Sequence, residues 1–163
     1  FLYVGTLDDR LDLDAVTETA ARWPHGRVVL VGPRPDPAVL APVEGLPNVI
    51  VHDPVGRAEV AGLISASDVC LLPHRSTPLT RAMSPLKLYE YLGGGARVVA
   101  SDLPPVRGVD PSVHIVADGA SYADAVAAAL GRPRPSEAER RGFLAANSWA
   151  SRHERILDVA LAE

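Results

Sequence analysis

The sequence predicts a single Rossmann-like domain of three α/β/α layers, with a parallel sheet of about six strands and two consecutive helices at its end. Three observations predict this class. Short apolar runs alternate along the chain with longer segments of helical periodicity. The apolar runs are continuous, as in strands that are buried on both faces of a sheet. After residue 131, two helix signals follow one another with no strand between them.

Six short runs predict strands, because each is rich in Val, Ile or Leu and is bounded by Gly, Pro, Asp or Asn. They are Phe1–Val4, Arg27–Val31, Asn48–Val51, Asp68–Leu72, Arg97–Ala100 and Val113–Val116. Strands that alternate with helical segments are joined by right-handed crossovers, so the sheet is expected to be parallel.

Four segments between these strands carry apolar residues at helical spacing. They are Leu13–Trp23, Arg57–Ala66, Ser84–Leu92 and Tyr122–Leu130. Ser121 is the predicted N-cap of the last one, and Gly131 follows its end.

The end of the chain predicts two further helices. Ser136 and Glu139 have the spacing of a capping box, which starts a helix that runs to about Asn147. Ser148 then caps a last helix over residues 149–160. The chain opens on an apolar run and not on Met, so we expect residues 1–163 to be one domain of a longer polypeptide.

Composition narrows the function. The formal net charge of −4 argues against a nucleic-acid partner, which selects a basic excess. No stretch approaches the roughly 18–20 apolar residues of a membrane span. The single cysteine, Cys70, lies in an apolar run, which predicts a buried thiol and a reducing compartment such as the cytoplasm. We predict no metal site: the acidic residues at 8–14 suit solvation and a helix start, and His25, His114 and His153 lack ligand partners.

In open parallel sheets, ligands bind beyond the carboxyl ends of the strands. The most informative segment there begins at Ser84, a predicted N-cap, with Pro85 at the first helical position. Free amides at a helix start suit a phosphate, and Lys87, the only lysine, adds a full charge. Glu90 lies on the same helix face, where its carboxylate can accept hydrogen bonds from two ribose hydroxyls. An ordinary i,i+3 surface ion pair is the alternative interpretation.

Several segments in order carry a resemblance to a known family. They are YVGTL at 3–7, SPLKLYEYL at 84–92, GGG at 93–95, RVVASDLP at 97–104, and Ser148-Trp149 followed by Arg152. With these segments the chain resembles the C-terminal, donor-binding domain of GT-B glycosyltransferases of the retaining, family-4-like group. The resemblance covers nearly the whole chain.

This resemblance implies roles for particular residues. Glu90 matches the second Glu of the family's Glu-x7-Glu motif, which binds the ribose of the donor. The diphosphate would be held by two loops and two basic side chains: Gly5, Thr6, Leu7, Ser84, Pro85, Leu86, Lys87 and Arg81. The nucleobase would lie against His52, Pro54, Val55, Gly56 and Arg57.

Three positions depart from the family pattern. Ala82 stands where the first Glu of the motif is expected, so the usual contact to the donor sugar is missing or replaced. Thr6, and Leu11 or Asp12, stand where the family often has Arg and Lys after the first strand, so two charges that would neutralise phosphate are absent. Lys87, Arg81 and Arg10 or Arg75 are the candidates to supply that charge. His74 and Arg75 face either the ligand or solvent, and His52 either contacts the base or is structural.

The expected function is a hexosyltransferase of the retaining kind that needs no cofactor or metal. The chain alone would bind a nucleotide sugar but transfer nothing, because a preceding N-terminal GT-B domain of the same polypeptide holds the acceptor. Contact of the full protein with a membrane surface stays open. Two alternatives are a receiver-like phospho-acceptor module, suggested by Asp8, Asp9 and Asp53, and the nucleotide-binding half of a GT-B-fold epimerase. A dehydrogenase is disfavoured, since the first turn has no G-x-G-x-x-G.

Overall fold

A computed structural model describes residues 1–162 and contains one six-stranded parallel sheet, in the order β3-β2-β1-β4-β5-β6. The strands are β1 (Leu2–Val4), β2 (Val28–Val31), β3 (Val49–His52), β4 (Cys70–Leu72), β5 (Val98–Ser101) and β6 (His114–Val116). The strand order changes direction between β1 and β4. The predicted class, a Rossmann-like α/β/α domain, is confirmed.

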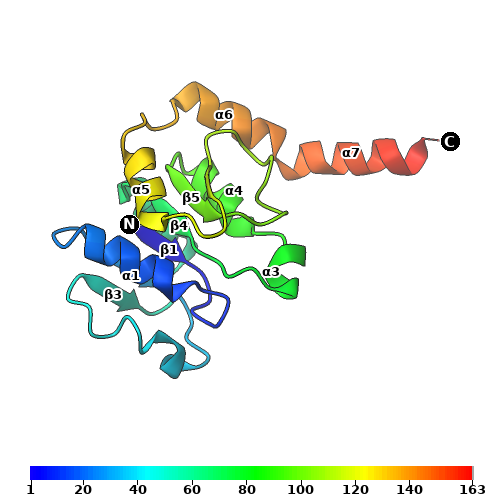
Figure 1. Ribbon diagram of the computed structural model, residues 1–163. Coiled ribbons are helices and arrows are strands. Elements are labelled where there is room, and N and C mark those ends of the chain that lie inside the picture. Colours follow the sequence, from blue (N-terminus) through cyan, green and yellow to red (C-terminus); the bar gives the residue numbers. More distant parts are fainter. Residues whose placement is uncertain (163) are drawn as a thin grey trace.

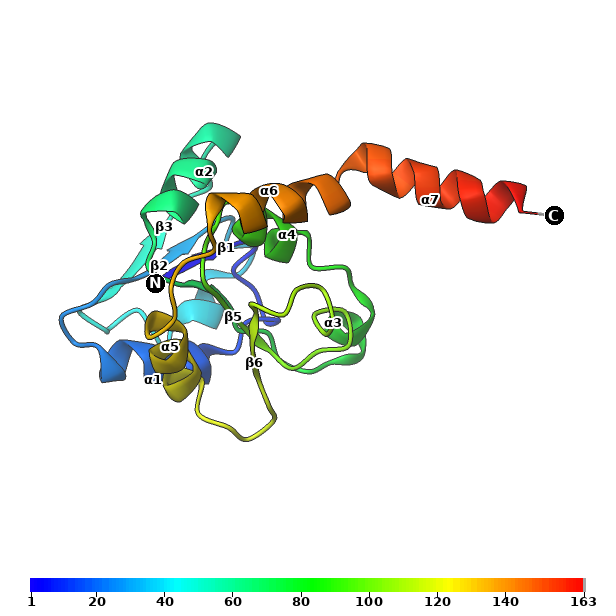
Figure 2. The same ribbon diagram turned by 90° about the horizontal axis from the view of Figure 1, so that it is seen from above.

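Helices cover both faces of the sheet, as Figures 1 and 2 show. One layer holds α1 (Leu13–Arg22) and α5 (Tyr122–Leu130), which pack against each other. The other layer holds α2 (Arg57–Ala66), α4 (Leu86–Gly93) and α6 (Glu137–Ala146), with α6 resting on α4. The last helix, α7 (Trp149–Leu161), extends away from the body.

The strand burial follows from these two layers. Every residue of the central strands β1 and β4 is buried, because helices cover both of their faces. On the edge strands β3 and β6, burial is incomplete, and Ile50 and Ile115 are each 40% exposed. The continuous apolar runs therefore indicated full burial correctly for the centre of the sheet, but not for its edges.

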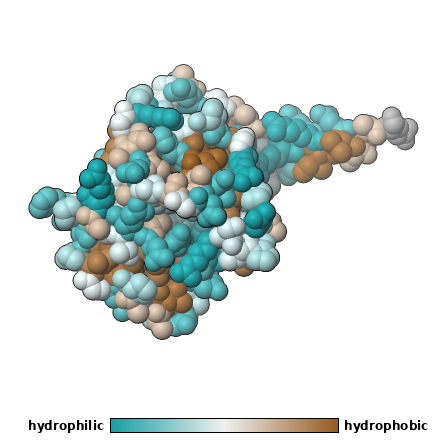
Figure 3. Space-filling view, viewed as in Figure 1, coloured by the Kyte–Doolittle hydropathy of each residue, from teal (hydrophilic) through white to brown (hydrophobic). Residues whose placement is uncertain are grey.

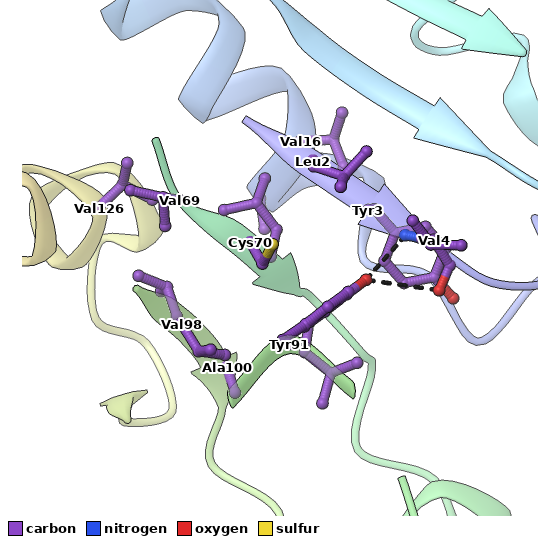
Figure 4. Close-up of a cluster of buried hydrophobic side chains, with 14 of the residues drawn as sticks. Leu2, Tyr3, Val4, Val16, Val69, Cys70, Tyr91, Val98, Ala100 and Val126 are labelled. Carbon is purple, nitrogen blue, oxygen red and sulfur yellow. Dashed lines mark hydrogen bonds between the residues drawn. The ribbon is translucent and has the colours of Figure 1, made fainter. Parts of the chain in front are cut away.

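Cys70 lies in the core on β4, opposite Leu2 of β1 and Val98 of β5 (Figure 4). It is a free, fully buried thiol, as predicted, and burial raises its pKa to about 12. It therefore acts as a small apolar side chain.

The helix starts were mostly predicted correctly. Ser121, Ser136 and Ser148 cap α5, α6 and α7, and Ser136 forms a complete capping box with Glu139. Two short elements were not predicted, η1 (Pro37–Leu40) and α3 (Pro78–Ala82).

Ser84 was wrongly predicted as the cap of the helix that carries Lys87. Pro85 is the N-cap of α4, without a side-chain hydrogen bond, and Leu86 is the first helical residue. The reason is local. Met83 ends α3 in an extended conformation, and a residue before proline avoids the helical region, so Ser84 belongs to the link between two helices.

The far end of the molecule differs from its body. Helix α7 leaves Trp149, Ile156, Leu157, Val159 and Leu161 more than half exposed, and Figure 3 shows apolar side chains along it. Within residues 1–162, no helix combines the length and the apolar character needed to cross a bilayer.

Candidate functional site

A groove of about 910 Å³ lies where the carboxyl ends of β1 and β2 meet the helices α2 and α4; we call it the α2–α4 groove. Its lining includes Gly5 and Thr6 after β1, Gly32 after β2, and Lys87 and Glu90 on α4. Ligands of open parallel sheets bind at such a place, next to the point where the strand order changes direction.

Two glycines bring the loops after β1 and β2 into direct contact. Gly32 has φ +153°, and a Cβ on it would lie 1.8 Å from the carbonyl oxygen of Gly5. A Cβ on Gly5 would in turn lie 2.6 Å from the hydroxyl of Tyr3. Only glycine fits at both positions, so the backbone itself forms this part of the groove wall.

Of the three residues after β1 that were predicted to hold the diphosphate, one has a free amide. The amide of Gly5 donates to the carbonyl of Val31 (2.9 Å), and that of Leu7 donates to the carbonyl of Pro33 (2.9 Å). Among the described residues, the amide of Thr6 has no such acceptor. The prediction that Leu7 offers its amide to a phosphate is therefore wrong for this structure, since Leu7 is fully buried and its amide is paired.

At the start of α4, as in the loop after β1, some backbone amides are paired within the chain. The amide of Leu86 donates to the carbonyl of Ser84 (3.0 Å), and that of Leu88 to the carbonyl of Pro85 (2.9 Å). The Lys87 amide between them finds no backbone acceptor among residues 1–162. Of the predicted helix-start amides, that of Leu86 is thus paired, and Pro85 has no N–H; the Ser84 amide has no acceptor among residues 1–162. Of these residues and Lys87, only Lys87 lines the groove.

Lys87 and Glu90 form an ion pair in the groove, with Nζ 2.6 Å from Oε2. Their side chains are 34% and 46% exposed. An exposed i,i+3 pair of this kind contributes on the order of 0–1 kcal/mol, so a ligand can separate it at little cost. The two interpretations of Lys87 and Glu90, a surface ion pair and a pair of ligand-binding residues, are therefore compatible. The two side chains form a surface ion pair, and both line the groove.

Of the residues predicted to contact a nucleobase, Pro54, Val55 and Arg57 line the groove. Gly56 is the N-cap of α2. His52 is exposed and does not line the groove; its Nδ1 lies 2.8 Å from the carbonyl oxygen of Asp53, to which it donates.

A second groove of about 620 Å³ lies on the other face, at the carboxyl ends of β4, β5 and β6. His74, Arg75 and Arg81 line it, and none of them lines the α2–α4 groove. Arg81, predicted beside the diphosphate with Lys87, is thus separated from Lys87. The intervening turn at 83–85 carries the chain from one groove to the other.

Arg10, the other candidate for the missing positive charge, is already neutralised. Its guanidinium contacts Asp8 at 2.7 Å, and this hydrogen bond holds the pKa of the Asp8 carboxyl below its usual value. Asp12 caps α1, as expected of the acidic segment. Within residues 1–162 no cluster of three or more metal-ligand side chains occurs.

His74 is buried, with 6% exposure. Its Nε2 lies 3.3 Å from the hydroxyl of Tyr3, which itself donates to the carbonyl of Thr6 (3.2 Å). The imidazole therefore donates through Nε2, and Nδ1 is a buried acceptor without a partner in the described chain. Burial lowers the pKa of His74 to about 4, so this ring is neutral at pH 7. Through the Tyr3 hydroxyl, it is linked to the Thr6 carbonyl of the loop after β1.

The sequence did not reveal the residues that close the far end of the α2–α4 groove. Arg140 and Leu144 of α6 line it, and Arg140 also donates to the carbonyl of Gly93 (3.1 Å). Tyr89 of α4 stacks on Phe143 of α6, with Arg152 of α7 4.6 Å from the centre of its ring. The capping box of Ser136 and Glu139 marks the start of α6 in the sequence, but nothing in the sequence indicates which helix α6 covers.

A third cavity, of about 540 Å³, lies beneath α6 near the amino ends of β5 and β6. It is at the opposite end of the sheet from the strand ends where ligands of this fold bind.

The fold and the groove define the class of α/β domains that hold a ligand at the carboxyl edge of a parallel sheet. The family model of glycosyl transferases group 1 matches residues 1–132. The chain belongs to this family. The resemblance inferred from the sequence is confirmed, and the receiver-like alternative is excluded. Two of the three aspartates that suggested a receiver-like module are paired, Asp8 with Arg10 and Asp53 with Arg34.

Among curated sequences, the chain is 30% identical over 129 residues to a protein of Bacillus subtilis (strain 168) that is named as a putative teichuronic acid biosynthesis glycosyltransferase, TuaH. The match covers 77% of this chain and 32% of that protein. The chain therefore spans about a third of this relative's length.

Two solved structures share the fold. AviGT4, a glycosyltransferase involved in avilamycin A biosynthesis, has a TM-score of 0.72 at 21% identity, over 96% of this chain and 48% of that one. A UDP-forming α,α-trehalose-phosphate synthase from Burkholderia xenovorans has a TM-score of 0.64 at 23% identity, over 99% and 43%.

Proposed function

We propose that this chain is the donor-binding domain of a retaining glycosyltransferase, and that the α2–α4 groove binds the nucleoside diphosphate of a nucleotide sugar. One observation carries the proposal. The free amide of Thr6, the ammonium and amide of Lys87, and the carboxylate of Glu90 all meet in one groove, at the carboxyl edge of the sheet.

These groups would contact different parts of the ligand. The amides of Thr6 and Lys87 and the Lys87 ammonium are hydrogen-bond donors that suit diphosphate oxygens. Glu90, one turn further along α4, is an acceptor that suits two ribose hydroxyls. Val55 and Pro54 offer an apolar surface for the base beyond them.

Binding would exchange the Lys87–Glu90 ion pair for two contacts with the ligand. Lys87 would turn to the diphosphate and Glu90 to the ribose. Because the exposed pair is worth little, the exchange costs little and leaves both charges satisfied. The low cost of this exchange explains how an ordinary surface ion pair can also bind a ligand, with Lys87 at the diphosphate and Glu90 at the ribose.

In the transfer step, the chain's contribution would be electrostatic. Negative charge grows on the leaving diphosphate, and fixed donors aimed at it stabilise the transition state. We propose that the acceptor is held by another domain of the same polypeptide, since the chain matches about a third of its curated relative. Residues 1–163 alone would then bind nucleotide without transferring sugar. No metal is assigned a role in this mechanism.

The name of the relative suggests a pathway class, the biosynthesis of a polysaccharide or glycoconjugate. We further propose that the transferred group is a hexose. The UDP-forming neighbour makes UDP the first diphosphate to test, although at 23% identity it supports the fold alone. We further infer a reducing compartment, the cytoplasm, because the one cysteine is a buried free thiol.

The experiment is calorimetric titration of the chain with UDP, GDP, ADP and dTDP, and then of Glu90→Gln with the best ligand. Loss of charged hydrogen bonds to the ribose should weaken binding by about 2 kcal/mol, roughly 30-fold. Glu154→Gln, an exposed helical glutamate on α7 away from the groove, is the matched control and should bind as the wild type does.

The proposal fails if none of the four diphosphates binds to the wild-type chain. It also fails if Glu90→Gln binds as tightly as Glu154→Gln, because the ribose would then lie elsewhere.

A further inference from the structure

Tyr91 follows Glu90 directly on α4, but its side chain enters the core. It is fully buried, with 0% exposure. Its hydroxyl accepts a hydrogen bond from the amide of Val4 at 2.7 Å and lies 3.4 Å from the Val4 carbonyl oxygen (Figure 4). A helix side chain thus makes a hydrogen bond that a neighbouring strand would normally make.

The reason lies in the change of strand order. Amides of β1 alternate between its two neighbours: that of Leu2 donates to Val69 on the β4 side, and that of Gly5 to Val31 on the β2 side. The Val4 amide therefore points to the β4 side. There, β1 and β4 pair only through Leu2 and Cys70, so the strands have separated by Val4.

A buried amide without an acceptor is costly, and the Tyr91 hydroxyl supplies the acceptor. Two elements become fixed to each other as a result. Val4 leads directly into Gly5 and Thr6, and Tyr91 sits one residue after Glu90. The hydroxyl joins the loop after β1 to the helix that carries Lys87 and Glu90.

We infer that Tyr91 is a positioning residue, whose hydroxyl sets the loop of Gly5 and Thr6 at the distance from α4 that a nucleoside diphosphate spans. This inference rests on the proposed function of the groove. A ligand that touches both elements then binds a preformed site, whereas a ligand that touches α4 alone does not need the link.

Tyr122 provides a matched control. Its hydroxyl donates to the carbonyl of Val99 (2.7 Å) and accepts from the amide of Leu72 (3.2 Å). It too is a buried tyrosine that bridges strand backbone from a helix, here between β4 and β5. Unlike Tyr91, it joins no residue of the α2–α4 groove.

The test compares Tyr91→Phe with Tyr122→Phe. For each variant, the affinity for UDP, or for the diphosphate that the wild type prefers, is measured beside that for its parent nucleoside. Tyr91→Phe should weaken diphosphate binding by about threefold to tenfold and nucleoside binding by less than about twofold, because only the diphosphate reaches the loop after β1. Tyr122→Phe should change neither affinity, although both variants unfold at lower temperature.

Amide hydrogen exchange gives a readout that needs no ligand. The amide of Val4, and those of Gly5 and Thr6 after it, should exchange faster in Tyr91→Phe than in Tyr122→Phe. If Tyr91→Phe does not fold alone, both variants are remade with Gly62→Ala, a helical position where a Cβ meets nothing, and kept in trimethylamine N-oxide.

Two results would overturn the positioning role: equal weakening for diphosphate and nucleoside, or equal effects of the two tyrosine variants on binding and exchange. Failure of the proposed function looks different. In that case the wild-type chain binds no nucleotide. If only the positioning role fails, the wild-type chain still binds nucleotide, and Tyr91→Phe has the same ratio of diphosphate affinity to nucleoside affinity as the wild type.

Discussion

The two grooves at the carboxyl edge of the sheet are built from neighbouring strand ends but differ in how their polar groups are used. The α2–α4 groove contains few charged side chains, and its lining includes four residues with free amides, Thr6, Val55, Arg57 and Lys87. The second groove contains more charged side chains, and half of them are engaged within the chain. Asp102 binds Arg107, Glu18 accepts from Ser121 and Tyr122, and Asp12 caps α1.

The number of charged side chains in a groove is therefore a poor guide to whether it binds a ligand. Polar groups that cap a helix or lie in the core stabilise the fold, whereas free backbone amides and a weak, exposed ion pair such as Lys87–Glu90 remain available to a ligand. In the α2–α4 groove the availability comes from glycine, since Gly5 and Gly32 let two loops meet without side chains between them.

The substitution with the strongest predicted consequence removes the close contact between Gly32 and Gly5. In Gly32→Ala, the new Cβ would meet the Gly5 carbonyl at 1.8 Å, so both loops must move. We expect the free energy of unfolding to fall by about 4 kcal/mol and nucleotide binding to disappear. Urea denaturation measures the first and calorimetry the second. Gly62→Ala, in the open on α2, should instead stabilise by about 0.5–1 kcal/mol. A mild effect of Gly32→Ala would show that the contact is not essential.

The second prediction tests whether His74 supports the fold or serves the second groove as a titrating group. The pKa of His74, about 4, lies below its ordinary value because of burial, so the unfolded chain binds more protons between about pH 6.5 and pH 4. Stability is therefore lost as the pH falls through that window.

By this linkage, the free energy of unfolding should drop by about 2 kcal/mol more between pH 7 and pH 5 in the wild type than in His74→Gln. Denaturation at the two pH values measures the drop. Identical drops in the two proteins would mean that His74 titrates normally.

A smaller effect is expected at Lys87. Lys87→Gln removes a charged donor to the diphosphate and also frees Glu90. We expect diphosphate binding to weaken by about 1 kcal/mol, roughly fivefold, and its dependence on salt to become shallower. Arg141→Gln, at an exposed site on α6 outside the groove, controls for net charge. Equal losses in the two variants would reduce the role of Lys87 to long-range attraction.

Replacing Arg81 tests whether the two grooves bind independently. Arg81→Gln should change nucleotide affinity by less than about twofold, since Arg81 lines the other groove. The same calorimetric titration measures it. A loss as large as that of Lys87→Gln would mean that the ligand extends across the turn at 83–85 and that the two grooves act as one.

The sequence was enough to predict the six strands and the six longer helices along the chain, the burial of the central strands and the helix caps at Ser121, Ser136 and Ser148, but not η1 or α3. These features depend on local periodicity and on side chains that bind backbone a few residues away. It also indicated Lys87 and Glu90 as a pair, because i,i+3 neighbours on a helix always share a face.

Only the tertiary structure decided which of the other predicted groups remain available. The Leu7 amide is taken by Pro33, the Arg10 guanidinium by Asp8, and Arg81 lies in a separate groove. It also revealed that Tyr91 takes up the Val4 amide and that α6 closes the site. Most of these pairings join atoms far apart in the chain, and local patterns do not specify such contacts, because they arise only when the sheet and its two helix layers come together.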